Sequence, residues 1–213
     1  MVTKEAAMRQ AILTMFAATA LLCGIASAAM ADVKILVKTR TYDIAGKTGG
    51  ELIAAMNRTG PRHGFTTRAV AETGYTIHWD LDIARTDGVC RLRQANGTMN
   101  LTYTFPRLAP GSSPALVRRW NRFFAGVRTH ERTHGRIARQ MMQATGKALA
   151  GLEQDDNFLC LGTHREARRR IREIYNRYEA KQVAFDAREH RDGGHVDRLV
   201  AGLAGGAGSA SVK

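Results

Sequence analysis

The amino-acid sequence predicts an α+β fold, in which a small antiparallel β-meander with one short helix precedes a helical half. Apolar and polar residues alternate with period two in the first half, most clearly over Tyr75–Ile83. From Leu116 onward the apolar residues recur at three- and four-residue spacing, as on one face of a helix. The length of 213 residues and the hydrophobic content of 44% suit a single domain with a substantial core.

An apolar run near the N-terminus predicts export. Lys4 and Arg9 precede Ala11–Ile25, which is almost wholly apolar, and small residues follow up to Ala31. This order matches the three regions of a secretory signal peptide. The alternative is a retained membrane anchor, but the run is shorter than the roughly 20 residues that span a bilayer. We therefore expect residues 1–31 to be a signal peptide, the mature protein to be periplasmic or secreted, and no stable membrane anchor to remain.

The β-rich half is expected over residues 32–110. Its first strand is predicted at Val33–Thr41, where β-branched residues alternate with polar ones. Thr48–Asn57 has the pattern of a short helix, which the following Gly60-Pro61 would stop.

Two dipeptides that are typical of tight turns divide the rest of this half. Asp87-Gly88 and Asn96-Gly97 both suit a two-residue hairpin connection. They are expected to join the strand over Tyr75–Ile83 to antiparallel strands at Val89–Arg93 and Thr98–Phe105. Consecutive strands of the meander would then be neighbours in the sheet.

The helical half is expected over residues 111–200. Ser113-Pro114 predicts a helix start, because serine is a common N-cap and proline fits the first position. A second helix is expected from Thr163, with Glu166 completing a capping box. Residues 201–213 are small and polar and predict a flexible tail. The stripe of the first helix consists of Leu116, Trp120, Phe123, Val127, His130, His134, Ile137 and Met141.

The cysteines indicate one disulfide. Cys23 lies in the predicted signal peptide, which leaves Cys90 and Cys160 in the mature chain. Two cysteines in an exported protein are expected to form a bridge, because the compartment is oxidising. The alternative is two separate buried thiols.

The chain is strongly basic. It has 32 Lys and Arg against 19 Asp and Glu, which gives a net charge of +13 and favours anionic surroundings. The run Arg168–Arg170 is flanked by Glu166 and Glu173 and lies off the apolar stripe, which indicates a solvated helix face. Export also argues against a nucleic-acid partner, and none is expected.

The pentapeptide His130-Glu131-Arg132-Thr133-His134 is an H-E-x-x-H motif on the predicted helix. Four residues advance a helix by about 400°, so the two imidazoles lie on one face and can share a Zn²⁺ ion. Glu131 lies about 100° further round, where its carboxylate can take a proton from a zinc-bound water. The alternative is a pair of buried histidines with ordinary hydrogen-bond partners, but the spacing around a glutamate favours the metal.

The third metal ligand is less well defined. The extended motif is absent, since Ile137 and Gln140 stand where glycine and histidine would be. Asp186 and His190 are four residues apart, so one helical face can present both of them. Either residue could ligate zinc while the other orients a ligand.

Further short motifs accompany the H-E-x-x-H. They are Tyr42-Asp43-Ile44-x-Gly46, Glu51-Leu52, Gly60-Pro61, the Trp79 strand, Cys90, Trp120-x-x-Phe123 and Cys160. On these residues the chain, over about residues 35–200, resembles a bacterial family catalogued as domain of unknown function 922, which is described as a predicted secreted Zn-dependent protease. The segment from Phe185 to Arg188 resembles the family's Tyr-Asp-x-x-Thr-x-His-Gly. There Glu189 replaces threonine and His190 is displaced by one position, so the resemblance carries over to Asp186.

The resemblance implies a zincin-like metallopeptidase domain over residues 32–200. We expect an exported zinc hydrolase in which His130 and His134 bind Zn²⁺, Asp186 or His190 completes the site, and Glu131 activates water against a peptide carbonyl. Its partner would be a peptide or protein substrate. The alternative is a catalytically inactive, zinc-stabilised scaffold that binds an anionic cell-envelope polymer, which the basic charge suggests.

Overall fold

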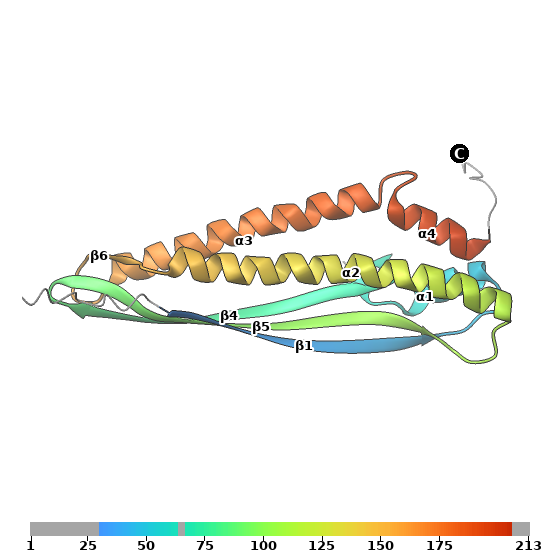
Figure 1. The fold of residues 1–213 in the computed structure, drawn as a ribbon, viewed down its shortest axis with the longest axis horizontal. Coiled ribbons are helices and arrows are strands. Elements are labelled where there is room, and N and C mark those ends of the chain that lie inside the picture. Colours follow the sequence, from blue (N-terminus) through green and yellow to red (C-terminus); the bar gives the residue numbers. More distant parts are fainter. Residues whose placement is uncertain (1–29, 64–66, 206–213) are drawn as a thin grey trace, which may run out of the picture.

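The computed structural model describes residues 30–63 and 67–205 and confirms the α+β class. A twisted sheet forms one layer and helices cover one of its faces, which makes the molecule long and narrow (Figure 1). The helix α2 (Pro114–Leu149) lies along the sheet, and α3 (Leu161–Glu189) packs against α2. The predicted signal peptide falls on residues outside the described ranges, apart from its last two positions.

The sheet is mixed, so the predicted purely antiparallel meander is wrong. Its strand order is β1-β5-β4, where β1 is Met30–Ile44, β4 is Glu72–Thr86 and β5 is Val89–Leu108. β4 runs antiparallel to β5, as predicted, but β1 runs parallel to β5. A parallel pair requires a long connection, and here α1 and β4 supply it.

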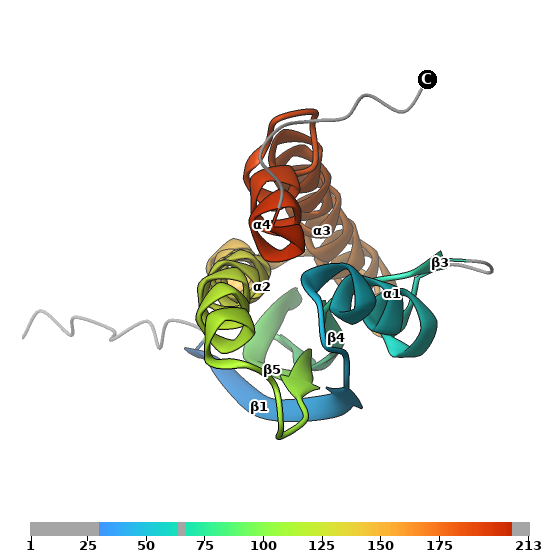
Figure 2. The ribbon, with the colours of Figure 1, turned by 90° about the vertical axis from the view of Figure 1, so that its right-hand side faces the viewer.

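The remaining elements are short. β6 (Glu153–Asp155) pairs with the beginning of β5, and β2 (Arg62–His63) pairs with β3 (Thr67–Arg68) in a separate sheet. The helices α1 (Gly49–Thr59) and α4 (His195–Ala204) meet α2 at the end of the molecule that faces the viewer in Figure 2.

The predicted turn at Asn96-Gly97 is wrong, because β5 runs through it as one strand of 20 residues. Gly97 is paired with Trp79 of β4, and a Cβ atom at Gly97 would lie 2.7 Å from the Trp79 ring. The same Cβ would lie 2.9 Å from Cε of Met142 on α2. The glycine therefore makes room for a ring and a helix. The turn at Asp87-Gly88 is confirmed, with φ angles of 52° and 85°.

The predicted starts of the helices α1 and α2 are confirmed. The hydroxyl of Thr48 caps α1, and the hydroxyl of Ser113 caps α2 with Pro114 in the first turn. The apolar stripe of α2 packs on the inward face of β5 and forms the main core. Its buried members are Leu116, Trp120, Phe123 and Val127 of α2 and Met99, Leu101, Tyr103 and Phe105 of β5.

The start of α3 differs from the predicted capping box. The helix begins at Leu161, and Thr163 is fully buried in its first turn. Asp156 caps this turn from outside the helix, because its Oδ2 accepts from Thr163 N at 2.7 Å and from Thr163 Oγ1 at 3.0 Å. Glu166 instead binds Arg169 at 2.6 Å and Arg170 at 2.8 Å.

The predicted tail over residues 201–213 begins later than expected. Ala201–Ala204 form the last turn of α4, and the side chain of Leu203 is fully buried. The backbone of Leu203 lies so close to α1 that a Cβ on Gly49 would come within 1.9 Å of its carbonyl oxygen. Small residues allow this close helix packing, which their composition alone does not reveal. Residues 206–213 lie outside the described ranges.

The predicted disulfide is confirmed. Cys90 of β5 and Cys160 at the start of α3 are bonded across a sequence separation of 70, with their Cα atoms 5.6 Å apart. A structural disulfide is compatible with export to an oxidising compartment. Among the described helices, none is both long and apolar enough to cross a bilayer.

Candidate metal centre

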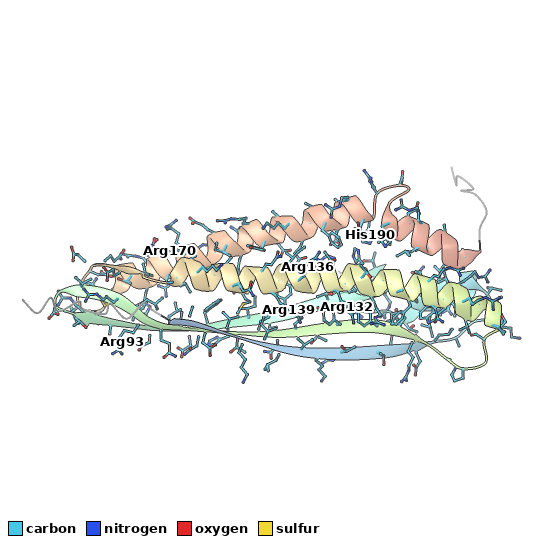
Figure 3. The ribbon with its side chains drawn as sticks, in the orientation of Figure 1. Arg93, Arg132, Arg136, Arg139, Arg170 and His190 are labelled. Atoms are coloured by element: carbon cyan, nitrogen blue, oxygen red, sulfur yellow. A yellow bond between two sulfur atoms is a disulfide. The ribbon has the colours of Figure 1, made fainter. Side chains whose placement is uncertain are left out.

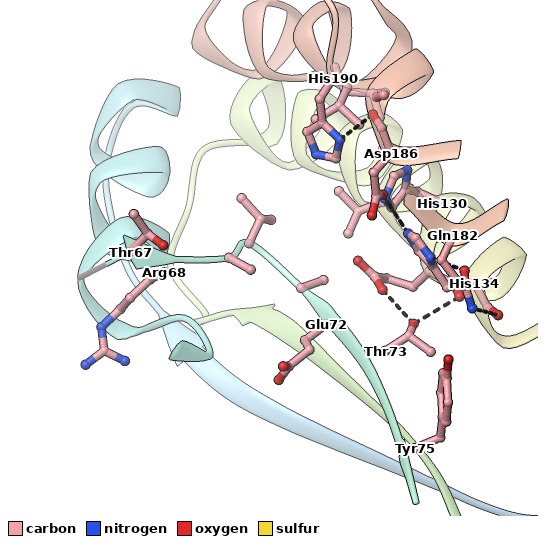
Figure 4. A pocket seen from close by; sticks show the side chains of 18 of the residues that line it. Thr67, Arg68, Glu72, Thr73, Tyr75, His130, His134, Gln182, Asp186 and His190 are labelled. Carbon is pink, nitrogen blue, oxygen red and sulfur yellow. Dashed lines mark hydrogen bonds and ion pairs between the residues drawn. The ribbon is translucent and has the colours of Figure 1, made fainter. Parts of the chain in front are cut away.

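The H-E-x-x-H motif lies in the wall of a cleft. The cleft has a volume of about 780 Å³ and is bounded by α2, α3, α4 and the segment that leads into β4 (Figure 4). His130, Glu131 and His134 enter it from α2, Asp186 enters it from α3, and His190 enters it from the position directly after α3. The structure therefore brings all five predicted site residues together, across 60 positions of sequence between the first and the last.

Three nitrogen and oxygen atoms form a small triangle at this wall. Nε2 of His130 and Nε2 of His134 are 3.1 Å apart. Oδ1 of Asp186 lies 3.4 Å from the first and 2.8 Å from the second. Ligands at 2.0–2.1 Å from a tetrahedral zinc ion are separated by about 3.3 Å. The edges of the triangle, 2.8–3.4 Å, are close to this separation, so the three atoms could hold one metal ion.

His190 lies one helical turn beyond Asp186. Its Nδ1 is 3.1 Å from the backbone oxygen of Asp186, so Nδ1–H donates there and Nε2 keeps a free lone pair. Ligand atoms of His130, Asp186 and His190 all lie within 4.8 Å of one another, and this group could also hold a metal ion. Of the two residues left open by the sequence, Asp186 is the one that contacts both motif histidines.

Gln182 orients His134. Its Oε1 accepts a hydrogen bond from His134 Nδ1 at 2.6 Å, and its Nε2 donates to the backbone oxygen of His134 at 3.2 Å. The first bond requires a proton on Nδ1, and the other ring nitrogen, Nε2, lies 2.8 Å from Oδ1 of Asp186. Such an outer partner fixes the tautomer and the ring orientation of a metal-binding histidine.

His130 is held by packing more than by hydrogen bonds. Its side chain is buried, and its ring centroid lies 4.9 Å from that of Phe185. Its Nδ1 has no hydrogen-bond partner among the described residues. Burial lowers the pKa of His130, with a further contribution from neighbouring His134. The neutral imidazole that results is the form that binds a metal ion.

Glu131 faces the cleft from the sheet side of α2. It is buried, and its Oε2 lies 2.6 Å from the hydroxyl of Thr73 on β4, which also lies 3.0 Å from the backbone oxygen of Glu131. Burial raises the pKa of this carboxyl group, and the bond to Thr73 opposes the shift. The side chain is thus fixed beside the triangle and outside it.

Two residues of this arrangement were not predicted from the sequence. Gln182 precedes Asp186 by four residues and interrupts the apolar stripe of α3, so a buried polar residue at that spacing is a usable signal. Thr73 lies at the beginning of β4, far from any motif, and only the fold brings it to Glu131.

The fold and the candidate site together describe the class of protein. A mixed sheet is covered by a long helix that carries two histidines, and these histidines lie in a cleft with a candidate metal site. The chain belongs to the bacterial family described as bacterial protein of unknown function (DUF922), whose sequence profile matches residues 39–194. This match spans both motif histidines and Asp186. Comparisons with curated proteins and with solved structures give no match.

Proposed function

We propose that this protein is a zinc-dependent hydrolase that cleaves peptide bonds. The observation that carries the proposal is the triangle of His130 Nε2, His134 Nε2 and Asp186 Oδ1, whose edges of 2.8–3.4 Å suit one tetrahedral ion. Three protein ligands leave a fourth position open, as in catalytic zinc sites. Two imidazoles and one carboxylate form a ligand set that is found in catalytic zinc sites.

The residues around the triangle suit the hydrolysis of a carbonyl group. A zinc ion held here would supply a Lewis acid for a substrate carbonyl and for an attacking water molecule. In the proposed mechanism Glu131 would accept the proton of that water and deliver it to the leaving nitrogen. Burial raises the pKa of Glu131 toward the pH of a neutral solution, and a pKa near the operating pH favours both proton transfers. The hydrogen bond from Thr73 keeps the carboxyl group of Glu131 turned toward the cleft.

The cleft supports a substrate larger than a single amino acid. Its volume of about 780 Å³ extends from α3 to the β3 segment. Its lining combines apolar side chains, such as Val127 and Leu199, with the charged groups of Arg68 and Glu179. A few convergent polar groups in a largely apolar cleft are typical of a substrate site.

Metal analysis and a peptide library test the proposal together. The purified protein is expected to bind one zinc ion, and His130→Ala is expected to lose it. Glu131→Gln is expected to keep zinc and to lose turnover by at least about a hundredfold, because general-base catalysis contributes roughly 10²–10⁴. Zinc affinity that is unchanged in His130→Ala would refute the site. Turnover that is unchanged in Glu131→Gln would refute the mechanism while leaving the site intact.

We also propose that the protein acts in the periplasm or outside the cell. The apolar run over Ala11–Ile25 and the disulfide between Cys90 and Cys160 support this location. N-terminal sequencing of the protein from its native host is expected to show a mature chain that begins close to residue 32. A full-length chain in the cytoplasmic fraction would contradict export.

A further inference from the structure

The outer face of α2 carries a row of basic side chains, which we call the basic face. Its members are Arg118, Arg122, Arg128, Arg132, Arg136, Arg139 and Lys147. All of them are exposed except Arg139, which is half-buried. At a rise of 1.5 Å per residue they extend over about 43 Å, nearly the whole helix. Arg132, Arg136 and Arg139 are labelled along α2 in Figure 3.

These charges are not neutralised within the described part of the protein. The one acidic residue of α2 is Glu131, which is buried and points away from the basic face. None of the seven cations takes part in an ion pair among the described residues, although Arg128 lies 5.8 Å from the Phe124 ring centroid. The basic face therefore presents its full positive charge to the surroundings.

Two of the arginines of α3 are neutralised by neighbouring glutamates, unlike any cation of the basic face, whereas Arg165, Arg168 and Arg172 of α3 take part in no ion pair among the described residues. On α3, Arg169 and Arg170 are paired with Glu166 and Glu173 at 2.5–2.8 Å. On α2, Arg128 and Arg132 are four residues apart, as are Arg132 and Arg136. The two arginines of each pair are therefore neighbours of like charge on the helix surface. Such pairs destabilise a helix, whereas opposite charges at this spacing stabilise it. An external polyanion would remove this repulsion.

We propose that the basic face docks the protein on a linear anionic polymer that carries repeated carboxylate or phosphate groups. A straight row of cations at helical spacing matches a linear chain of negative charges. The solvent side of α2 between the cations holds Ala125, Thr129, Gln140 and Gln143, with no aromatic or leucine side chain to enter a bilayer. The apolar face of α2 is already buried against the sheet, unlike that of a membrane-surface helix. The observations thus favour a polymer over a lipid surface.

Docking through the basic face leaves the cleft accessible. Arg132 follows His130 by two positions, which is about 200° round the helix. The cleft opens on the side of α2 that faces α3, α4 and β4, whereas the basic face borders β1, where Gly146 of α2 lies against Ala31 and Val33. The bound polymer would hold the protein in place while the cleft stays open to other molecules. This inference does not depend on the proposed hydrolase activity.

Binding of fluorescently labelled alginate, a linear carboxylated polysaccharide, tests the inference. The triple variant Arg132→Gln/Arg136→Gln/Arg139→Gln is expected to bind alginate at least about tenfold more weakly, since each arginine near an anionic surface contributes roughly fivefold. The matched control is Arg165→Gln/Arg168→Gln/Arg172→Gln on α3, which removes the same charge from exposed positions. This control is expected to lose less than about threefold.

Three results would overturn the inference. The first is an equal loss of affinity in the two triple variants, which would show that only net charge matters. The second is a wild-type protein that does not bind alginate at low salt. The third is binding to phosphatidylglycerol vesicles that depends on the basic face and exceeds binding to alginate. Unchanged circular dichroism and thermal unfolding would show that the variants are folded.

Discussion

Gln182 is the residue that decides how His134 faces the cleft. Its amide holds both Nδ1 and the backbone oxygen of His134, at 2.6 and 3.2 Å. Without the amide, the ring can rotate and the tautomer with the proton on Nε2 becomes accessible. A glutamate at this position would keep an oxygen acceptor for Nδ1, whereas a leucine would remove it.

We therefore predict that Gln182→Leu lowers zinc affinity by about 10–100-fold, as is usual for the loss of an outer partner. Gln182→Glu is expected to restore most of this affinity. Competition with a chromophoric chelator measures both values. If Gln182→Leu bound zinc as tightly as the wild type, the orienting role would be wrong. A weak affinity in both variants would indicate that the amide matters for folding and not as an acceptor.

The sequence predicts the candidate metal-binding residues better than the residues that support them. His130, Glu131 and His134 share one helix, so their relative placement follows from helical geometry. Asp186 belongs to another helix, and the sequence alone could not separate it from His190. Thr73 could not be found at all, because its contact with Glu131 depends on how α2 lies on the sheet.

At the scale of elements, Gly97 shows why the local sequence predicts a turn where β5 continues as a strand. An Asn-Gly pair is typical of a turn, but glycine is also required where two elements approach closely. Trp79 lies opposite Gly97 and is anchored by a hydrogen bond from its Nε1 to the hydroxyl of Tyr175 on α3, at 3.0 Å. The space above Gly97 is therefore already filled by a fixed ring, a fact that local sequence does not contain.

We predict that Gly97→Ala destabilises the protein by about 1–3 kcal/mol, the usual cost of overpacking a core. The new methyl group would lie 2.7 Å from the Trp79 ring and 2.9 Å from Met142. Gly74→Ala on β4 is the matched control, because its Cβ would meet nothing within 4 Å. Urea unfolding measures both. A neutral Gly97→Ala would show that Trp79 and Met142 can move aside.

The stability that Glu166 contributes to the first turns of α3 is expected to depend on pH. Hydrogen bonds from Arg169 and Arg170 lower the pKa of Glu166 from 4.5 to about 2. The folded pKa is below the unfolded one, so the stabilisation is complete above about pH 4.5 and is lost as the pH falls toward 2.

Accordingly, Glu166→Gln is expected to be less stable than the wild type at pH 7, by at most about 1 kcal/mol because surface ion pairs are screened by solvent. The difference is expected to shrink as the pH falls below about 4.5, and also in 1 M salt. Urea unfolding at a series of pH values measures it. A difference that is independent of pH would mean that Glu166 contributes through packing alone.

At the scale of the whole molecule, α3 is fastened at its two ends. Cys160 ties its beginning to β5, and near its end Asp186 meets His130 and His134 of α2. Between these points α3 has few buried residues, whereas one face of α2 carries buried residues from Leu116 to Leu149. The buried residues of α3 are Thr163, Ala167, Ile174, Gln182 and Phe185. The helix therefore depends on its end attachments more than on apolar packing.

We predict that reducing the disulfide, and removing the metal ion that the proposed site would bind, each accelerate amide hydrogen exchange in α3 more than in α2. Loss of a native disulfide typically costs 2–5 kcal/mol, and a metal at about a hundred times its Kd contributes about 2.7 kcal/mol to the folded state. Reduction is expected to act first on the beginning of α3, near Cys160, and chelation on its end, near Asp186. Asp186→Asn is the control for chelation, since it should exchange rapidly near the end of α3 with or without zinc. Equal acceleration in α2 and α3 would contradict this view, because it would mean that the two helices open only when the whole domain unfolds.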